Sequence, residues 1–249
     1  SPMSRGLGDV YKRQAYSKGD DWYERFFLTF GSKKYDKTVA FDATPANLYL
    51  PYVPERIKKY RSDMKIIILL REPVSRAYSA WNMLKENYDK YHSKSFKIVR
   101  QFIPAYIRNS PATQNMKTEL FEVPAYPSFE EVVAKEMDKI KHGSPHYEPS
   151  FLRRGFYAEQ IKRYYEHFPK EQILILSSKL LKTDLENQLN RILNFIDLPN
   201  YDWSKLEKQQ KNAYKYSEPI NTDIKAKLQA FYEPYNKQLF ELLGEEIKW

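Results

Sequence analysis

The sequence predicts an α/β domain built on a parallel sheet with helices on its faces. Short apolar runs of strand length alternate along the chain with segments whose apolar residues recur at helical spacing. With 249 residues, of which 42% are hydrophobic, the chain is long enough to bury a sizeable core. We therefore expect one domain over residues 15–249, carrying an insertion at about 88–150.

Three apolar runs are expected to form strands. They are TVAFDAT (38–44), MKIIILL (64–70) and EQILILSS (171–178). The second and third carry apolar residues at successive positions, which is typical of parallel strands buried on both faces. The first is shorter and more polar, and we expect it to lie beside the second.

Helical periodicity fills the intervals between these runs. An apolar stripe from Phe156 to Phe168 precedes the last strand, and Asp184 is placed to cap the helix that follows it. A C-terminal helix is expected over 221–243, bent at Pro234. These stripes are interpreted as packing faces.

The insertion and the N-terminus depart from this pattern. Between 88 and 150 the sequence becomes polar and proline-spaced around one expected helix at 129–141, and we interpret it as an insertion over the active face. Residues 1–14, SPMSRGLGDVYKRQ, have no apolar period and resemble translated sequencing adapters. We interpret them as a non-native leader, the alternative being an ordinary N-terminus.

Composition narrows the classes of function. A formal net charge of +9 favours an anionic partner, which includes nucleic acid, a membrane surface, a nucleotide and a sulfated or carboxylated polymer. The absence of cysteine excludes disulfides, thiolate catalysis and zinc-thiolate sites. No apolar run approaches the roughly 18 residues that a membrane span needs. The compartment is not fixed by the sequence, and a cytoplasmic location is expected.

The stretch KIIILLREPVSRAYSAW (65–81) predicts an anion site at a strand-to-helix corner. Arg71 directly follows the expected strand, where ligands bind in open parallel sheets. Pro73 suits the first turn of a helix, whose backbone N–H groups would point at the same crevice. Together with the guanidinium of Arg71 and the hydroxyl of Ser79, they would hold a phosphate dianion. Alternatively, Arg71 and Arg76 pair with carboxylates at the sheet edge.

The segment REPVSRAYSAW resembles the R-x-P-x-x-R-x-x-S element of PAPS-dependent sulfotransferases. The resemblance covers nearly all of 15–249 and is closest to the heparan sulfate type. Further similar segments follow the family's order: YSKGDDWYERFF, FDATPANLYLPYVPERIKKY, the helix-strand-helix unit from RGFYAEQ to FIDLP, and the C-terminal LQAFYEPYNKQLFELLGEEIKW. The resemblance implies a sheet of the P-loop-nucleoside-kinase type. It also implies sulfuryl transfer from 3′-phosphoadenosine 5′-phosphosulfate (PAPS) to a hydroxyl or amine of a carbohydrate-like acceptor, without a required metal.

The resemblance assigns the donor contacts. Arg71 and Ser79 match the residues that hold the 3′-phosphate of PAPS. The basic stretch KQQKNAYKY (208–216) lies where the family has a loop that closes over the nucleotide, and Lys211 is its best candidate for a phosphate contact. A solvated basic loop is the alternative there.

Three further residues are candidates for binding the acceptor. Trp22 and Tyr23 match the segment that follows the family's base, although packing of an amphipathic helix explains them equally well. Asp42, at the end of the first expected strand, could orient a reacting group, or it could form a structural hydrogen bond. The four histidines suggest neither a metal site nor a catalytic triad.

Departures from the family pattern are also informative. The phosphate-loop lysine and the glutamate base would lie upstream of Tyr16, so the catalytic residues are not assigned. We expect an N-terminally truncated chain that lacks its first strand and is inactive. Ala43 stands where heparan sulfate enzymes commonly have lysine, which weakens the case for a heparan acceptor. The absence of the disulfide-closed loop of animal members indicates a bacterial-type relative.

Two other classes of function stay open at this point. One is a non-catalytic module that binds a nucleotide or an anionic glycan. The other is a basic nucleic-acid-binding domain, which would need aromatic residues and lysines on one face. Because the aromatic residues here fall into apolar stripes, no nucleic-acid partner is expected.

Overall fold

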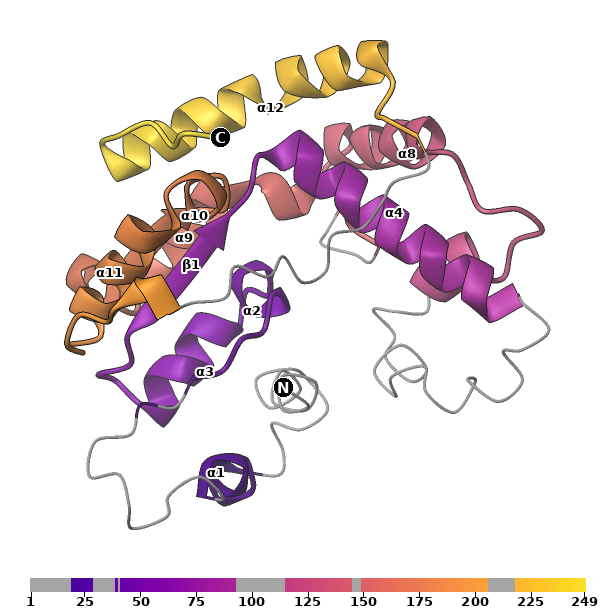
Figure 1. Cartoon of the computed structure of the whole chain (residues 1–249). Helices are drawn as coiled ribbons and strands as arrows, with labels where there is room; N and C mark the ends of the chain where they lie inside the picture. Colours follow the sequence, from indigo (N-terminus) through magenta and orange to yellow (C-terminus); the bar gives the residue numbers. More distant parts are fainter. Residues whose placement is uncertain (1–18, 29–38, 40, 93–114, 145–148, 206–217) are drawn as a thin grey trace. The chain divides into compact units, whose positions relative to one another are not determined.

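The computed structural model describes residues 19–28, 39, 41–92, 115–144, 149–205 and 218–249 (Figure 1). These residues divide into two compact units. The first unit comprises the described residues up to Ile68 together with Glu159–Leu176, and the second comprises those in Leu69–Ala158 and Ser177–Trp249. The expected leader at 1–14 lies outside the described residues, and a domain over 15–249 with an insertion at 88–150 stays a prediction.

The first unit consists of short helices and most of two strands. Its core is formed by apolar side chains that include Val53, Ile57, Ile161 and Phe168, all of them buried. In chain order its elements are α1 (Asp20–Leu28), α2 (Ala46–Tyr49), α3 (Val53–Tyr60), the start of β1 (Ile66–Leu70), most of α9 (Tyr157–Tyr165), the 3₁₀ turn η7 (Lys170–Gln172) and most of β2 (Ile173–Ser177).

Two of the three expected strands are confirmed. β1 and β2 lie within the predicted 64–70 and 171–178 and pair as a two-stranded parallel sheet. The strand expected at 38–44 is wrong for its described part, because 41–44 form no strand and the Phe41 side chain is 80% exposed. The reason is local: the chain turns into α2 here, with the Asn47 N–H bonded to the Thr44 carbonyl at 3.0 Å.

β1 is half-buried, and the expectation that both of its faces are covered is therefore wrong. Ile68 and Leu70 are buried, whereas Ile67 and Leu69 are 42% and 52% exposed. Successive side chains of a strand point to opposite faces, so one face of β1 packs into the core. The opposite face is open in the part of the chain that the structure describes.

The second unit is mainly helical. Its long helices coincide with the sequence predictions, since helices were expected at 129–141 and 221–243 and after Pro73. The elements are α4 (Pro73–His92), the π-helical turn η5 (Lys117–Phe121), α8 (Phe129–Lys141), the 3₁₀ turn η6 (Arg153–Gly155), α10 (Leu180–Thr183), α11 (Leu185–Phe195), the 3₁₀ turn η8 (Trp203–Lys205) and α12 (Thr222–Leu243).

Capping residues define the ends of these helices. Ser128 and Glu131 form a capping box that starts α8. The Asn221 side chain accepts the Asp223 N–H at 2.8 Å at the start of α12. Asp184 precedes α11 as expected, but its carboxylate accepts hydrogen bonds from side chains of the first turn, such as Asn187 at 2.7 Å, instead of capping the backbone.

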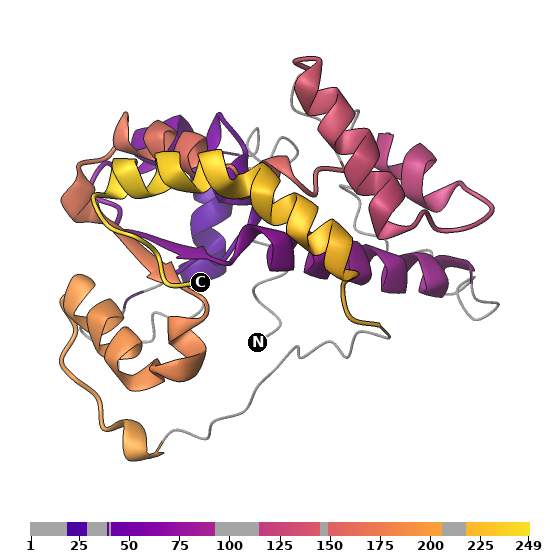
Figure 2. The same cartoon turned by 90° about the horizontal axis from the view of Figure 1, so that it is seen from above.

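One apolar core joins α4, α8 and α12. α12 packs against α4 (Figure 2). The core includes Val74 and Ala77 of α4, Val133 of α8, and Leu228 and Tyr232 of α12. None of the described helices is both long enough and apolar enough to span a membrane.

Candidate functional site

The predicted strand-to-helix corner is present in the second unit. β1 ends at Leu70, α4 begins at Pro73, and Arg71 is the first residue after the strand. The Ser178 N–H, just after β2, donates to the Leu70 carbonyl at 2.8 Å. The Tyr157 hydroxyl donates to the Arg71 carbonyl, also at 2.8 Å. The Leu70 and Arg71 carbonyls are therefore each held by one hydrogen bond from elsewhere in the chain.

The two arginines of the motif differ in their surroundings. The Arg71 side chain is half-buried, and its guanidinium makes no hydrogen bond or ion pair with any other described residue. Arg76 instead donates to the Phe151 carbonyl, which lies just before η6. Neither arginine pairs with a carboxylate among the described residues. Arg76 supports the structure, whereas the guanidinium donors of Arg71 are bonded to no other described residue.

The first turn of α4 differs from the expectation. The Glu72 carboxylate accepts the Val74 N–H at 2.9 Å and the Ser75 N–H at 2.7 Å, and it also accepts the Ser75 hydroxyl at 2.6 Å. The prediction that these amides hold a phosphate is therefore wrong, because a side chain of the same motif caps them. An anion at this corner would rely on side chains.

Ser79 lies in the second turn of α4 and is half-buried. It follows Ser75 by four residues and Glu72 by seven, so helical spacing places the three on one face. Val74 and Ala77 form the buried face. Ser79 is thus on a side of α4 that is distinct from the core face.

A close approach fixes the start of α4. Gly155 is buried, and a Cβ atom on it would lie 3.0 Å from the Pro73 Cβ and 2.8 Å from Cε1 of Tyr232. The Tyr232 hydroxyl donates to the Leu152 carbonyl at 2.9 Å, which holds that ring in place. Only glycine fits at position 155 without displacing Pro73 or Tyr232.

Tyr157 holds the strand-to-helix corner in place through its hydrogen bond to the Arg71 carbonyl. Its side chain is buried, and burial raises the pKa of its hydroxyl, which keeps it protonated as a donor to Arg71. Its ring centroid lies 6.1 Å from that of Trp249. The neighbouring Lys248 carbonyl accepts the Ser177 hydroxyl at 2.6 Å, at the end of β2. The C-terminal residues therefore pack behind both strand ends.

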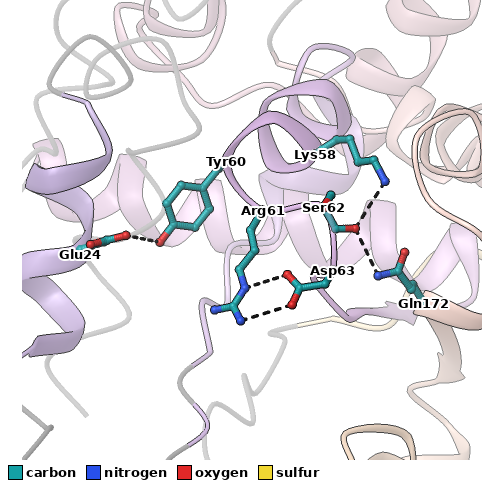
Figure 3. Close-up of polar contacts among 7 residues, drawn as sticks. All are labelled: Glu24, Lys58, Tyr60, Arg61, Ser62, Asp63 and Gln172. Carbon is teal, nitrogen blue, oxygen red and sulfur yellow. Dashed lines mark hydrogen bonds and ion pairs between the residues drawn. The ribbon is translucent and has the colours of Figure 1, made fainter.

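The acceptor candidates Trp22 and Tyr23 lie on α1 in the first unit. The Tyr23 side chain is 3% exposed, and its ring packs edge-on against Tyr60 of α3 with a centroid distance of 5.3 Å. The Tyr60 hydroxyl donates to Glu24 at 3.3 Å (Figure 3). Burial, with Glu24 as the next cause, raises the pKa of Tyr60. For Tyr23 these contacts favour the packing interpretation, while Trp22 is half-buried.

Figure 3 also shows the turn that leads into β1. Arg61 and Asp63 form an ion pair with an Nε to Oδ1 distance of 2.8 Å, which lowers the pKa of Asp63. The Ser62 carbonyl accepts Lys58 Nζ at 3.4 Å and the Gln172 side-chain amide at 3.3 Å. Because Gln172 directly precedes β2, the turns before the two strands are joined by a hydrogen bond.

Asp42 also belongs to the first unit. One of its carboxylate oxygens accepts the Thr44 hydroxyl at 2.8 Å, which is the structural hydrogen bond that the sequence left open. The following α2 turn is held by α9, where the Tyr164 hydroxyl donates to the Asn47 carbonyl at 3.0 Å. Asp42 is half-buried.

The predicted contacts are thus divided between the units. Arg71 and Ser79 share the second unit, Trp22, Tyr23 and Asp42 share the first, and Lys211 lies outside the described residues. Within the described ranges, no three histidine or acidic side chains cluster closely enough to hold a metal ion.

Sequence reasoning missed three contributors to the corner: the cap by Glu72, the close approach at Gly155, and the hydrogen bond from Tyr157. The first had a local signal, because an acidic residue directly before a proline at the first helical position is a capping arrangement. The other two join Pro73 and Arg71 to residues more than 80 positions further along the chain and have no local signal.

Comparisons with known proteins agree on one family. The family profile described as "Sulfotransferase domain" matches residues 32–232. "Membrane-associated sulfotransferase kil1" of Dictyostelium discoideum is 24% identical over 96% of this chain and 59% of that protein. Mouse "Heparan sulfate glucosamine 3-O-sulfotransferase 5" is 22% identical over 94% of this chain and 62% of that protein. The chain therefore spans less than two thirds of the length of these curated relatives.

A solved structure supports the fold. The "Crystal Structure of Sulfotransferase from Alicyclobacillus acidocaldarius" superposes with a TM-score of 0.59 and 23% sequence identity, covering 92% of this chain and 73% of that one. At this identity the likeness concerns the fold. It confirms the predicted α/β architecture, of which the described residues retain a two-stranded sheet.

Proposed function

The chain belongs to the sulfotransferase domain family, and from this premise we propose that it is a PAPS-dependent sulfotransferase. It would move a sulfuryl group from PAPS to a hydroxyl or amine of a carbohydrate-like acceptor. The observation that carries the proposal is the Arg71 guanidinium, which follows β1 directly and makes no bond to other described residues. A half-buried cation that no described residue neutralises is well suited to an anionic ligand.

Arg71 and Ser79 are proposed to hold the 3′-phosphate of the donor. The guanidinium presents a planar set of N–H donors that matches a phosphate, and the Ser79 hydroxyl adds a donor from α4, the helix that follows. Since Glu72 caps the first turn of α4, these side chains would supply the anchoring without the amides of Val74 and Ser75. Lys211 is proposed as an additional cation.

The chain's own residues would act by positioning. PAPS supplies the sulfuryl group, and holding its nucleotide in a fixed place orients that group toward an acceptor. The backbone at Arg71 is bonded to Tyr157, so the side chain starts from a fixed point. This chemistry calls for cationic contacts and a proton acceptor and does not call for a metal.

The acceptor is proposed to be a carbohydrate. The names of several relatives include heparan sulfate glucosamine, and the net charge of +9 suits an anionic polysaccharide. Ala43 stands where a lysine is common in the heparan sulfate type, so the polymer need not be heparan sulfate. Trp22, Tyr23 and Asp42 stay proposals for acceptor contacts.

Isothermal titration calorimetry with adenosine 3′,5′-bisphosphate and 5′-AMP tests the anchoring. We expect the bisphosphate to bind more tightly and Arg71→Ala to remove most of the difference, a loss of about 10²-fold from two charge-assisted hydrogen bonds. Arg61→Ala is the matched control, because it removes the same charge from an exposed ion pair with Asp63. Equal affinities of the wild type for both nucleotides would exclude a 3′-phosphate site.

A transfer assay tests the activity itself. The chain is incubated with radiolabelled PAPS and a panel of glucosamine-containing and uronate-containing polysaccharides, and labelled polymer is counted. Transfer that depends on Arg71 would support a sulfotransferase. Tight nucleotide binding with no labelled acceptor would instead indicate the non-catalytic binding module that the sequence left open.

A further inference from the structure

The second unit contains a deeply buried carboxylate away from the corner. Glu136 of α8 is 1% exposed. Its carboxylate accepts hydrogen bonds from the Ser150 hydroxyl at 2.9 Å and from three successive backbone N–H groups, those of Phe151 at 2.7 Å, Leu152 at 2.9 Å and Arg153 at 3.0 Å. These amides begin the η6 turn and would otherwise lack helical partners.

Burying a carboxylate destabilises the folded state unless hydrogen bonds offset the loss of its hydration. Burial raises the pKa of Glu136, and the four donors oppose that shift without fully offsetting it. A well-packed apolar side chain would often be more stabilising at such a place. What an apolar residue cannot do is accept three consecutive amides, so the carboxylate fixes the backbone of 151–153 in one conformation.

This backbone is the support on which the start of α4 rests. The Phe151 carbonyl accepts the Arg76 guanidinium, and two residues after Arg153 the buried Gly155 meets Pro73. The Leu152 carbonyl accepts the Tyr232 hydroxyl at 2.9 Å, which ties α12 to the same turn. A shift of 151–153 would therefore reach α4 at its first and second turns.

We propose that Glu136 is a positioning residue for the nucleotide anchor, acting through residues 151–155 on the start of α4 and so on Arg71 and Ser79. The proposal rests on the proposed function for its consequence in binding. It does not place Glu136 in contact with the nucleotide. Under this proposal α8 helps to position the start of α4, because its Glu136 carboxylate holds the backbone of residues 151–153.

The test compares Glu136→Gln with a matched variant in the first unit. Gln keeps the size of the side chain but offers one acceptor atom, so it cannot satisfy all four donors. Tyr164→Phe removes a hydrogen bond from a buried side chain of the first unit, that to the Asn47 carbonyl, at the end of α9 opposite to Tyr157. Glu136→Asp keeps the charge on a shorter side chain and serves where the Gln variant fails to fold.

Two measurements are made on each variant of the 249-residue chain under conditions where it is folded. Amide hydrogen exchange is followed over 72–79, and the affinity for adenosine 3′,5′-bisphosphate is measured by calorimetry. We expect Glu136→Gln to speed exchange at the start of α4 and to weaken nucleotide binding about tenfold. Glu136→Asp should have smaller effects in the same direction, and Tyr164→Phe should change neither quantity.

The two measurements distinguish failure of the positioning role of Glu136 from failure of the proposed function. Unchanged exchange over 72–79 in Glu136→Gln, or in Glu136→Asp if only that variant folds, would overturn the positioning role. Equal effects of Tyr164→Phe on exchange and affinity would overturn it too, because they would reflect general loss of stability. Absence of bisphosphate binding by the wild type would instead refute the proposed function.

Discussion

Substitution of Gly155 by alanine gives a direct measure of how tightly the start of α4 is packed. An added Cβ would lie 2.8 Å from Cε1 of Tyr232 and 3.0 Å from both the Tyr232 hydroxyl and the Pro73 Cβ. These distances are shorter than ordinary carbon contacts of about 3.5–4.0 Å. Tyr232 is fully buried and its hydroxyl is bonded to Leu152, so it has little room to yield.

The magnitude follows from two contributions. Overpacking of a core typically costs about 1–3 kcal/mol, and straining the Tyr232 hydrogen bond adds about 0.5–1.5 kcal/mol. We therefore expect Gly155→Ala to lower the free energy of unfolding by about 2–4 kcal/mol, as measured by urea titration at constant slope. Because Pro73 is displaced with Tyr232, the affinity for adenosine 3′,5′-bisphosphate should fall as well.

Two variants check the reasoning. Gly19→Ala, at a left-handed glycine with open space around it, should lose stability through backbone strain and leave nucleotide affinity unchanged. In a Tyr232→Leu background the ring is gone, and Gly155→Ala should cost less than in the wild type. A Gly155→Ala protein within about 0.5 kcal/mol of the wild type, the scatter of ordinary surface substitutions, would refute the contact argument.

Two further predictions concern carboxylates. Glu72→Ala should lower the free energy of unfolding by about 0.5–2 kcal/mol, because the helix cap is lost. The same variant should bind adenosine 3′,5′-bisphosphate more tightly, because it frees the Val74 and Ser75 amides and removes a negative charge beside Arg71. Weaker binding in calorimetry would contradict this. Burial raises the pKa of Glu136. Between the ordinary glutamate pKa and this raised value, the native state therefore holds a proton that the unfolded state has released. The stability that Glu136 contributes is fully present below the ordinary glutamate pKa and is lost as pH rises through the raised value. Urea titrations across that range should show wild-type stability falling with pH more steeply than that of Glu136→Gln, and parallel profiles would exclude the shift.

The helices could be predicted from the sequence because their signals are local. The bounds of α8 were predicted correctly, and the structure shows a local signal for its start, a capping box formed by Ser128 and Glu131. The bounds of α12 were predicted from an apolar stripe that begins after Asn221, whose side chain caps the helix. In both cases the decisive residues lie within one turn of the end that they define.

The strand expected at 38–44 failed for the opposite reason. A strand exists only where another backbone pairs with it, and an apolar run such as TVAFDA does not reveal its partner. The described part of this run has Asp42 bonded to Thr44 and leads straight into α2. Local side-chain hydrogen bonds of this kind compete with ladder pairing.

The sequence motif predicted the position of Arg71, but it did not predict the distant residues that hold the backbone there. Arg71 could be placed at a strand end from its sequence context, and the structure puts it there. Its partner Tyr157 lies 86 residues further along the chain, and no periodicity connects the two. Glu72 could have been read as a cap, because capping of a helix start by an acidic side chain needs no tertiary contact.

The short segment from Ser150 to Tyr157 accounts for most of the contacts that hold the corner. Its amides bind Glu136, its carbonyls accept Arg76 and Tyr232, its glycine admits Pro73, and its last residue bonds the Arg71 carbonyl. These contacts reach the start of α4 as well as α8 and α12, so no single helix could replace them. Since Glu72 already occupies the first amides of α4, anchoring would depend on side-chain charges, whose geometry needs such support. The stretch SFLRRGFY is therefore as much a part of the proposed anion site as the arginine and serine that would touch the phosphate.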